Sequence, residues 1–332
     1  MKNKQKILVT GAKGQLGKKI IELLSSEYEL VLTDSDEMDI TDKDKVFEVI
    51  GKEKPDFIIH GAAYTRVDDA EEKTDLCRKI NAEGSKNVAL AAKANNTTML
   101  YISTDFVFDG KLGLGTQDSG LSRSPKAQDL KPKPYTEEDE TNPESVYAQT
   151  KLEGENFVRE ICPKYYILRT AWLFGELPEG HPGTNFVEAM LKLSKERDSL
   201  NVVSDQIGSP TYTEDLVKII QRIIRSEGLG LRAQDAQDPR PKTQDPALVP
   251  YGIYHVSGTG EASWYDFAKE IFEQTNTKID LKPITSAEYP QKAKRPSYSY
   301  MDKSKIEKAL GIKIRPWQEM LRDYLSNRSK NG

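Results

Sequence analysis

The sequence predicts an α/β protein in which a doubly wound parallel sheet is followed by a smaller C-terminal lobe. Short apolar runs alternate with helical patterns over the first 170 residues. The runs lack polar alternation, which is typical of strands that helices cover on both faces. A glycine-rich turn, Gly11-Ala12-Lys13-Gly14-Gln15-Leu16-Gly17, follows the first run and opens a helix. This strand–turn–helix order is typical of a Rossmann-like, dinucleotide-binding domain.

Composition is that of a soluble globular chain, and its 332 residues are enough for two lobes. With 48 basic and 52 acidic residues the net charge is −4, so we expect no nucleic-acid partner and no membrane surface. Cys77 and Cys162 form no CxxC pair, which speaks against a zinc site or a disulfide framework. No run reaches membrane-spanning length, and Ile7-Leu8-Val9 is too short for a signal-peptide core, so a cytoplasmic location is expected.

The elements are expected in a fixed order along the chain. Strands are placed at the continuous apolar runs, and helices where apolar residues recur with helical spacing. The expected strands are Lys6 to Val9, Tyr28 to Leu32, Phe57 to His60, Met99 to Ser103 and Tyr165 to Arg169. The expected helices are Leu16 to Ser25, Asp75 to Ala94, Ser145 to Ile161, Asn185 to Ser194, Trp264 to Gln274 and Ser304 to Leu310.

Two segments, 111–134 and 227–250, interrupt this pattern. They are poor in large apolar residues, rich in Gly, Pro, Ser, Gln and Lys, and share a repeated Gln-Asp motif. Such stretches bury too little surface to offset the entropy of ordering, so we interpret them as flexible surface insertions, with partner docking as the alternative. The dinucleotide-binding domain is then assigned to 1–170 and 201–226, and the smaller lobe to 171–200 and 251–326.

The glycine turn supplies three glycines with separate tasks. Gly11 permits the tight turn, Gly14 lets the backbone approach a pyrophosphate, and Gly17 lets the helix pack on the strand. The backbone of Gln15 and Leu16 then presents the positive end of the helix to the phosphates. The spacing is GxxGxxG and not the GxGxxG of many dehydrogenases.

The choice between NADPH and NADH stays open at this point. Asp34 ends the second strand, seventeen residues after Gly17, where a carboxylate can bond a ribose 2′-hydroxyl and would repel a 2′-phosphate. Lys13 in the glycine turn would instead favour a 2′-phosphate. Asp34 could also be only a loop-capping residue. Asp39 and Ile40 are expected beside the adenine ring, unless they only start the next helix.

Tyr147 and Lys151 lie four residues apart on an expected helix and therefore share one face of it. A nearby ammonium favours the phenolate and brings the phenol proton within reach of catalysis. Thr104 and Asp105 end the fourth strand, where ligands bind in such sheets, so the Thr104 hydroxyl could bond a substrate carbonyl beside Tyr147. Taken singly, Tyr147 and Lys151 could equally be a solvated pair on a helix surface, and Thr104 and Asp105 could be a helix cap or turn.

Eight stretches form a specific set of motifs that covers nearly the whole chain outside the insertions. They are 11–17, 61–68 (GAAYTRVD), 103–110 (STDFVFDG), 146–155, 168–175 (LRTAWLFG), 185–186, 205–211 (DQIGSPT) and 294–296 (KRP). In these stretches the chain resembles the extended short-chain dehydrogenase/reductases and, more narrowly, the dTDP-4-dehydrorhamnose reductase family.

The resemblance implies a reaction and a set of residue roles. The C4 ketone of dTDP-4-dehydro-L-rhamnose would be reduced by NADPH or NADH to give dTDP-L-rhamnose for polysaccharide biosynthesis. Thr104, Tyr147 and Lys151 would be catalytic. Ala62 and Ala63 would join the glycine turn in holding the cofactor, with Tyr147 and Lys151. The nucleotide sugar would be contacted by Thr65, Val67, Thr104, Asp105, Trp172, Asn185 and Arg295, the last through its diphosphate unless it is only a surface arginine.

Alternatives and departures accompany this resemblance. The family has a short link where this chain inserts 111–133, which could alter access to the site, and Ala148 stands where glycine is common. Two rival functions remain. One is another nucleotide-sugar epimerase or reductase, and the other is a non-catalytic subunit similar to the regulatory subunit of methionine adenosyltransferase. A homodimer is one option for the assembly.

No metal is expected, because His60 and His255 fit packed, hydrogen-bonded positions. Trp264 fits a core-facing helix better than a stacking platform.

Overall fold

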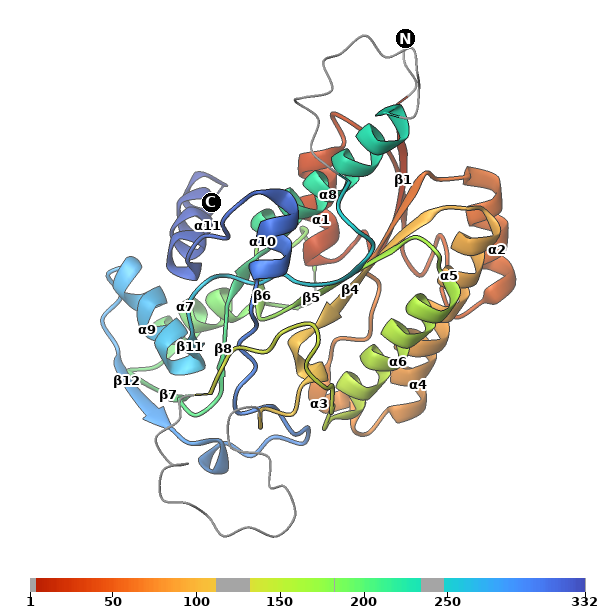
Figure 1. Cartoon of the computed structure of the whole chain (residues 1–332). Helices are drawn as coiled ribbons and strands as arrows, with labels where there is room; N and C mark the ends of the chain where they lie inside the picture. Colours follow the sequence, from red (N-terminus) through yellow and green to blue (C-terminus); the bar gives the residue numbers. More distant parts are fainter. Residues whose placement is uncertain (1–3, 112–131, 182, 234–247, 332) are drawn as a thin grey trace.

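A parallel sheet of six strands forms the centre of the molecule (Figure 1). The computed structural model describes residues 4–111, 132–181, 183–233 and 248–331. The expected doubly wound α/β fold is confirmed. In sheet order the strands are β10 (Gly252–His255), β5 (Tyr165–Thr170), β4 (Thr98–Thr104), β3 (Phe57–His60), β1 (Lys6–Thr10) and β2 (Glu29–Thr33).

The strand order reverses between β1 and β3. The chain runs from β1 to β2 at the sheet edge and then crosses back to pair β3 on the other side of β1. In open α/β sheets the ligand crevice lies beyond the carboxyl ends of the strands at this point. Thr10, His60 and Thr104, which end β1, β3 and β4, therefore mark the position of the site.

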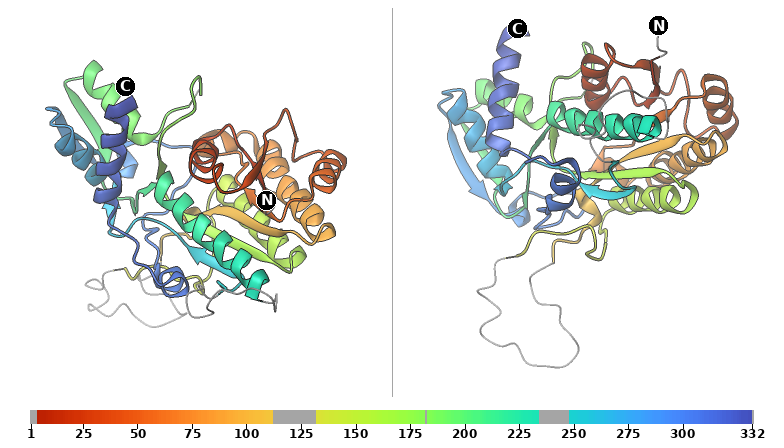
Figure 2. Two further views of the ribbon diagram at one scale, coloured as in Figure 1. Left: turned by 90° about the horizontal axis from the view of Figure 1, so that it is seen from above. Right: turned by 45° about the horizontal axis from the view of Figure 1, so that its top comes forward.

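Helices cover both faces of the sheet (Figure 2). Strand β1 shows why: Ile7 and Val9 belong to one apolar cluster, Leu8 to the cluster on the opposite face, and all three are fully buried. One face of the sheet carries α1 (Gln15–Leu24) and α8 (Thr213–Ala233), and the other carries α2 (Lys43–Glu53), α5 (Ser85–Ala94) and α6 (Val146–Ile161). Within the described ranges, no helix is long and apolar enough to cross a membrane.

The smaller lobe packs a short parallel strand pair, β7 with β12, between helices. Local sequence sets its helix ends: Ser263 and Asp266 form a capping box at the start of α9, and Gly311 ends α10 in a left-handed conformation. Its elements are β6 (Leu173–Phe174), α7 (Phe186–Glu196), β7 (Ser199–Val203), β8 (Ile207–Gly208), β9 (Thr211–Tyr212), β11 (Ala262–Ser263), α9 (Trp264–Gln274), β12 (Asp280–Ile284), η4 (Ser286–Glu288), α10 (Ser304–Leu310) and α11 (Trp317–Asn331).

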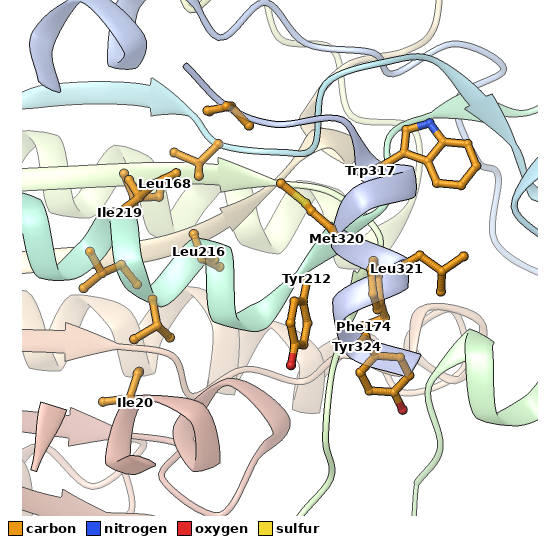
Figure 3. Close-up of a cluster of buried hydrophobic side chains, with 14 of the residues drawn as sticks. Ile20, Leu168, Phe174, Tyr212, Leu216, Ile219, Trp317, Met320, Leu321 and Tyr324 are labelled. Carbon is orange, nitrogen blue, oxygen red and sulfur yellow. The ribbon is translucent and has the colours of Figure 1, made fainter. Parts of the chain in front are cut away.

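One apolar cluster runs from the sheet into the smaller lobe. In Figure 3, α8 lies between Leu168 of β5 above it and Ile20 of α1 below it, and the labelled residues of α11 lie beyond its right-hand end. Phe174 connects the two parts, because its ring lies 5.6 Å from the rings of both Tyr212 and Tyr324. The two lobes thus share a core, which holds the walls of the site at a fixed separation.

The long helix expected over Asp75–Ala94 is interrupted. It consists of α4 (Thr74–Arg78), a π-helical turn η1 (Lys79–Gly84) and α5. Inside the π turn, the Asn81 amide accepts from the Tyr64 N–H at 2.7 Å and donates to the Tyr64 carbonyl at 3.2 Å. The turn thereby anchors the loop after β3, in keeping with the frequent occurrence of π turns at functional sites.

Strand β10 lies inside 251–326, the range expected in the smaller lobe, yet it pairs β5 of the central sheet. A run of four residues beginning with glycine carries little strand signal, and pairing with β5 buries Tyr254 and His255. Helices α2, α8 and α11 and strand β10 were not predicted. Most of both expected insertions, 112–131 and 234–247, lies outside the described residues, so neither the flexibility nor the access role expected for them is tested.

Candidate active site

A cleft of about 1550 Å³ opens at the carboxyl ends of the strands, between the sheet and the smaller lobe. It brings together the glycine turn, the ends of β2, β3 and β4, one face of α6 and two tryptophans. The sequence-predicted residues that line it are Gly11, Gly14, Gln15, Leu16, Gly17, Asp34, Asp39, Ile40, Ala62, Ala63, Thr65, Val67, Thr104, Asp105, Tyr147, Lys151, Trp172 and Arg295.

The glycine turn is shaped by contacts that only glycine allows. Gly11 has a φ of +71°, and a Cβ there would lie 2.9 Å from the Ala62 nitrogen. A Cβ on Gly17 would lie 2.4 Å from the Ala12 carbonyl oxygen. Gly14 is the N-cap of α1, and no side chain caps that helix. Its first-turn N–H groups are therefore available to a phosphate, and the turn fits a dinucleotide.

The end of β2 carries more negative than positive charge. Asp34 accepts from the Lys13 N–H at 3.1 Å and from the Ser35 N–H at 2.9 Å. The Lys13 ammonium is itself paired with Asp36 at 2.7 Å and with Glu37 at 3.2 Å. Two carboxylates therefore pair with the one ammonium and Asp34 adds a third negative charge to this segment, which favours a ribose hydroxyl over a 2′-phosphate at this position.

The loop after β3 is held by a buried hydrogen-bond chain through His60. His60 Nδ1 lies 2.7 Å from the Thr10 hydroxyl, which accepts from the Ala62 N–H at 3.1 Å. His60 Nε2 lies 3.0 Å from Ser85 Oγ, whose hydrogen goes to the Asn81 carbonyl. The histidine is thus a neutral Nε2–H donor, and burial lowers its pKa to about 3. His60 is the packed, hydrogen-bonded residue that was predicted; within the described ranges no cluster of three or more His, Cys, Asp or Glu could hold a metal.

Tyr147 and Lys151 project from α6, whose N-cap Ser145 accepts from the Ala148 N–H at 3.3 Å. The Lys151 ammonium donates to the Ile102 carbonyl at 2.7 Å and lies 4.0 Å from the centre of the Tyr101 ring. Burial lowers the pKa of Lys151 to about 7. We expected this lysine to lower the pKa of Tyr147, but burial raises the pKa of that phenol, and its hydrogen bond with Thr104 opposes the rise. The lysine charge is instead directed at the Ile102 carbonyl.

Thr104 and Asp105 form a turn in which each side chain has a protein partner. The Thr104 hydroxyl accepts from the Phe106 N–H and donates to one Asp105 oxygen, both at 3.2 Å. The other Asp105 oxygen accepts from the Ser299 hydroxyl at 2.5 Å. Asp105 is only 2% exposed, and both of its carboxyl oxygens have hydrogen-bond partners within the protein.

Two stacked tryptophans form the wall of the cleft on the side of the smaller lobe. The rings of Trp172 and Trp264 are 3.7 Å apart at an angle of 8°. Trp172 has a φ of +45°, a strained value for a bulky residue. A Cβ on Gly208 would come within 2.7 Å of the Trp172 ring, so glycine there makes room for the stack. Trp264 packs against the core as predicted, but it also lines the cleft and stacks, which was not predicted.

Arg295 and Asn185 differ in their relation to the cleft. Arg295 lines it and is held by Asp68, with nitrogen–oxygen distances of 2.7 and 3.2 Å. Asn185 does not line it, although a substrate contact was predicted. Its side chain accepts from the Glu188 N–H at 3.0 Å and donates to the Gly175 carbonyl at 2.7 Å, so Asn185 is the buried N-cap of α7.

Several functional positions were missed by sequence reasoning. Residues 177–181, 183 and 184 contribute to the cleft lining, and their composition resembles that of an ordinary loop. Ser299, the partner of Asp105, lies 194 residues further along the chain, and Asp68, the partner of Arg295, lies 227 residues away from it. No spacing in a single sequence indicates such pairs. Asp68 does lie inside the 61–68 motif, which is the signal that could have identified it.

Comparison with known proteins gives a consistent result over the whole chain. The family model described as RmlD substrate binding domain matches residues 5–329. A dTDP-4-dehydrorhamnose reductase of Aggregatibacter actinomycetemcomitans is 39% identical over 326 residues, covering 96% of this chain and 97% of that protein. The crystal structure of such a reductase from Clostridium acetobutylicum is 40% identical, with a TM-score of 0.82 and coverage of 98% and 100%. One from Bacillus anthracis in complex with NADP is 37% identical, with a TM-score of 0.81 and coverage of 98% and 99%.

Proposed function

Because the chain belongs to the dTDP-4-dehydrorhamnose reductase family, we propose that it reduces the C4 ketone of dTDP-4-dehydro-L-rhamnose to give dTDP-L-rhamnose, with NADPH or NADH as the reductant. The observation that carries this proposal is the joint placement of Thr104, Tyr147 and Lys151 in one cleft with a glycine turn that fits a dinucleotide. The protein is then an oxidoreductase of nucleotide-sugar biosynthesis.

The residues that would hold the cofactor line one half of the cleft. The turn from Gly11 to Gly17 would bind the pyrophosphate through backbone N–H groups, and Asp34 would bond the adenosine ribose. Ala62 and Ala63 would border the dinucleotide, and Lys151 would bond the nicotinamide ribose. A bound reduced nicotinamide supplies the hydride for the reaction.

Tyr147 is the proton donor in this proposal. As C4 of the sugar gains the hydride, its oxygen takes the phenol proton, and Tyr147 is left as the phenolate. Because burial raises the pKa of the phenol, that phenolate needs stabilisation. The Thr104 hydroxyl provides a hydrogen bond. The Lys151 ammonium, which donates to the Ile102 carbonyl, would add opposite charge from the same face of α6 once the phenolate forms.

The nucleotide part of the substrate fits the other half of the cleft. Arg295 would bind the diphosphate with its guanidinium, which Asp68 holds at the edge of the cleft. The stacked Trp172 and Trp264 provide an apolar wall for the sugar nucleotide, and Thr65 and Val67 line the cleft between the two regions. Asn185 is left out of this assignment because its side-chain oxygen caps α7 and its side-chain nitrogen donates to the Gly175 carbonyl and the Tyr324 hydroxyl.

The test is absorbance at the nicotinamide band with dTDP-4-dehydro-L-rhamnose and either NADPH or NADH. We expect oxidation of at least one cofactor and formation of dTDP-L-rhamnose. Cofactor binding without turnover of this sugar would contradict the proposal. It would point to another keto-sugar nucleotide or to a regulatory role.

Neutralising Asp34 should shift the cofactor preference toward NADPH. In Asp34→Asn the ratio of kcat/KM for NADPH to that for NADH should rise roughly tenfold, because an exposed charge pair about 4 Å apart contributes ~1 kcal/mol per unit charge. Initial rates with both cofactors measure the ratio. Asp44→Asn, on the exposed start of α2, is the control with the same change in net charge. An unchanged ratio in Asp34→Asn would contradict the ribose-binding role of Asp34.

The rate of ketone reduction should fall as the pH rises through about 7, the value to which burial lowers the pKa of Lys151. Below this pH the ammonium is present and stabilises the Tyr147 phenolate; above it that stabilisation is lost. The pH dependence of kcat at saturating substrate measures the effect. Lys151→Arg keeps its charge at all accessible pH values, so its profile should fall less steeply. A wild-type rate that stays level to about pH 9 would contradict the role of the ammonium.

The division of the chain into two lobes, its oligomeric state and its cellular location are also part of this proposal. We assign 1–170 and 201–226 to dinucleotide binding and 171–200 and 251–326 to the nucleotide sugar, with β10 joining the first group. The proposed location is the cytoplasm. A homodimer is one option for the assembly, and light scattering tests it.

A further inference from the structure

A hydrogen-bond chain connects the C-terminal segment to Thr104, beside the proposed proton donor Tyr147. The Ser299 hydroxyl donates to Asp105 at 2.5 Å, and the Thr104 hydroxyl donates to the other oxygen of the same carboxyl at 3.2 Å. Thr104 lines the cleft with Tyr147, and its hydroxyl opposes the rise that burial causes in the pKa of that phenol. Ser299, Asp105 and Thr104 are all at least nine-tenths buried, so water does not compete freely for these bonds.

The position of the Ser299 hydroxyl is set by the backbone around it. The Ser299 N–H donates to the Ile207 carbonyl at 2.7 Å, and the Ile207 N–H donates to the Ser297 carbonyl at 2.8 Å. The Tyr135 N–H donates to the Tyr300 carbonyl at 2.8 Å. These bonds hold Ser299 beside Asp105. Its hydroxyl has a second acceptor in the Ile207 carbonyl at 3.5 Å, but the bond to Asp105 is the shorter one.

Thr104 has one hydroxyl hydrogen and more than one acceptor for it. While that hydrogen goes to Asp105, Thr104 can only accept from Tyr147, and it cannot donate to the ketone oxygen of a substrate. In a neutral Asp105 carboxyl, one oxygen accepts from Ser299, and the other, which faces Thr104, carries the acid hydrogen and can donate it to the Thr104 hydroxyl. Thr104 is then free to turn its hydrogen toward the reacting oxygens.

We propose that Asp105 and Ser299 are positioning residues that decide where Thr104 directs its hydrogen, with neutral Asp105 as the form that supports ketone reduction. This inference rests on the reductase function proposed above. The charge of Asp105 also favours its neutral form in catalysis. An ionised Asp105 raises the pKa of Tyr147 and makes it harder for the phenol to give up its proton. Neutral Asp105 removes that cost and releases the Thr104 hydrogen for the substrate or the phenolate.

The surroundings of Asp105 make its ionisation accessible near neutrality. Burial raises the pKa of Asp105 to about 7, and the Ser299 hydrogen bond opposes the rise. The titratable group that faces Asp105 from α6 is Tyr147. The tyrosines beside Ser299 have other partners: Tyr298 donates to Glu261 at 2.8 Å, and the Tyr300 hydroxyl accepts from the Gly260 N–H at 3.1 Å.

The pH profile of reduction by the full-length protein tests this inference. Wild type loses activity at alkaline pH through both Asp105 and Lys151, so log kcat should fall by about two per pH unit. In Asp105→Asn, which cannot ionise, it should fall by about one per pH unit. Ser299→Ala removes one stabilising hydrogen bond to the carboxylate, so Asp105 should ionise about one pH unit higher. The fall that Lys151 causes should still begin near pH 7 with a slope of about one, and the steeper slope of about two should set in about one pH unit later than in wild type.

A matched variant separates this role from a structural one. Ser297→Ala changes an exposed hydroxyl in the same segment and should leave the profile unchanged. Equal losses at every pH in Asp105→Asn and Ser299→Ala, or a profile in both that matches wild type, would overturn the inference. These outcomes differ from failure of the proposed function, because that failure would leave wild type itself without turnover.

Discussion

Replacing Tyr147 by phenylalanine should lower kcat by about 10³-fold, because a positioned general acid contributes 10² to 10⁴ to the rate. The variant keeps the ring, its edge-to-face contact with Phe106 at 6.2 Å and its place on α6, and loses only the hydroxyl. Nicotinamide absorbance measures turnover, and fluorescence titration of the bound cofactor measures its affinity. We expect the affinity for NADPH or NADH to change little, since the glycine turn and Asp34 are untouched.

Tyr165→Phe is the matched control for this experiment. It removes a phenol hydroxyl at the start of β5, outside the cleft lining, and should retain wild-type turnover. Full activity of Tyr147→Phe would exclude the phenol as the proton donor. The proton would then have to reach the ketone oxygen by another route, through Thr104 or Lys151.

Replacing Gly17 by alanine should remove measurable cofactor binding at ordinary concentrations and destabilise the fold. The added Cβ would lie 2.4 Å from the Ala12 carbonyl oxygen, and a backbone atom cannot rotate away as a side chain can. Helix α1 must then move from the turn that would hold the pyrophosphate. We expect an increase in cofactor Kd of about 100-fold, and a loss in the free energy of unfolding of about 1–3 kcal/mol, as for other overpacked sites.

Gly51→Ala provides the contrast, because it is also a helical glycine. Nothing lies within 4 Å of a Cβ at position 51 in α2, so this variant should gain roughly 0.5–1 kcal/mol of stability and bind cofactor normally. Urea unfolding and cofactor titration of the two variants measure both effects. Normal cofactor affinity in Gly17→Ala would show that the turn does not hold the pyrophosphate as proposed.

Elements with a strong local pattern were predicted well. Helices α9 and α10 have the bounds that the sequence predicted, and Ser145 precedes α6 as its cap. These features depend on neighbours within one or two helical turns, which a sequence shows directly. The π turn η1 was missed because it arises from the contact of Asn81 with Tyr64, seventeen residues away. Strand β10 was missed because its strand character comes from pairing with β5.

The sequence by itself determined the doubly wound fold, the glycine turn and the Tyr147–Lys151 pair, because each depends on residue types at short spacing. Only the tertiary structure decided the partners of those residues. Folding pairs Asp105 with Ser299, directs Lys151 at the Ile102 carbonyl, stacks Trp172 on Trp264 and places Asn185 at the start of α7. Such contacts join distant parts of the chain, and burial then shifts the pKa values of the groups involved. Their geometry and protonation therefore exist only in the folded protein.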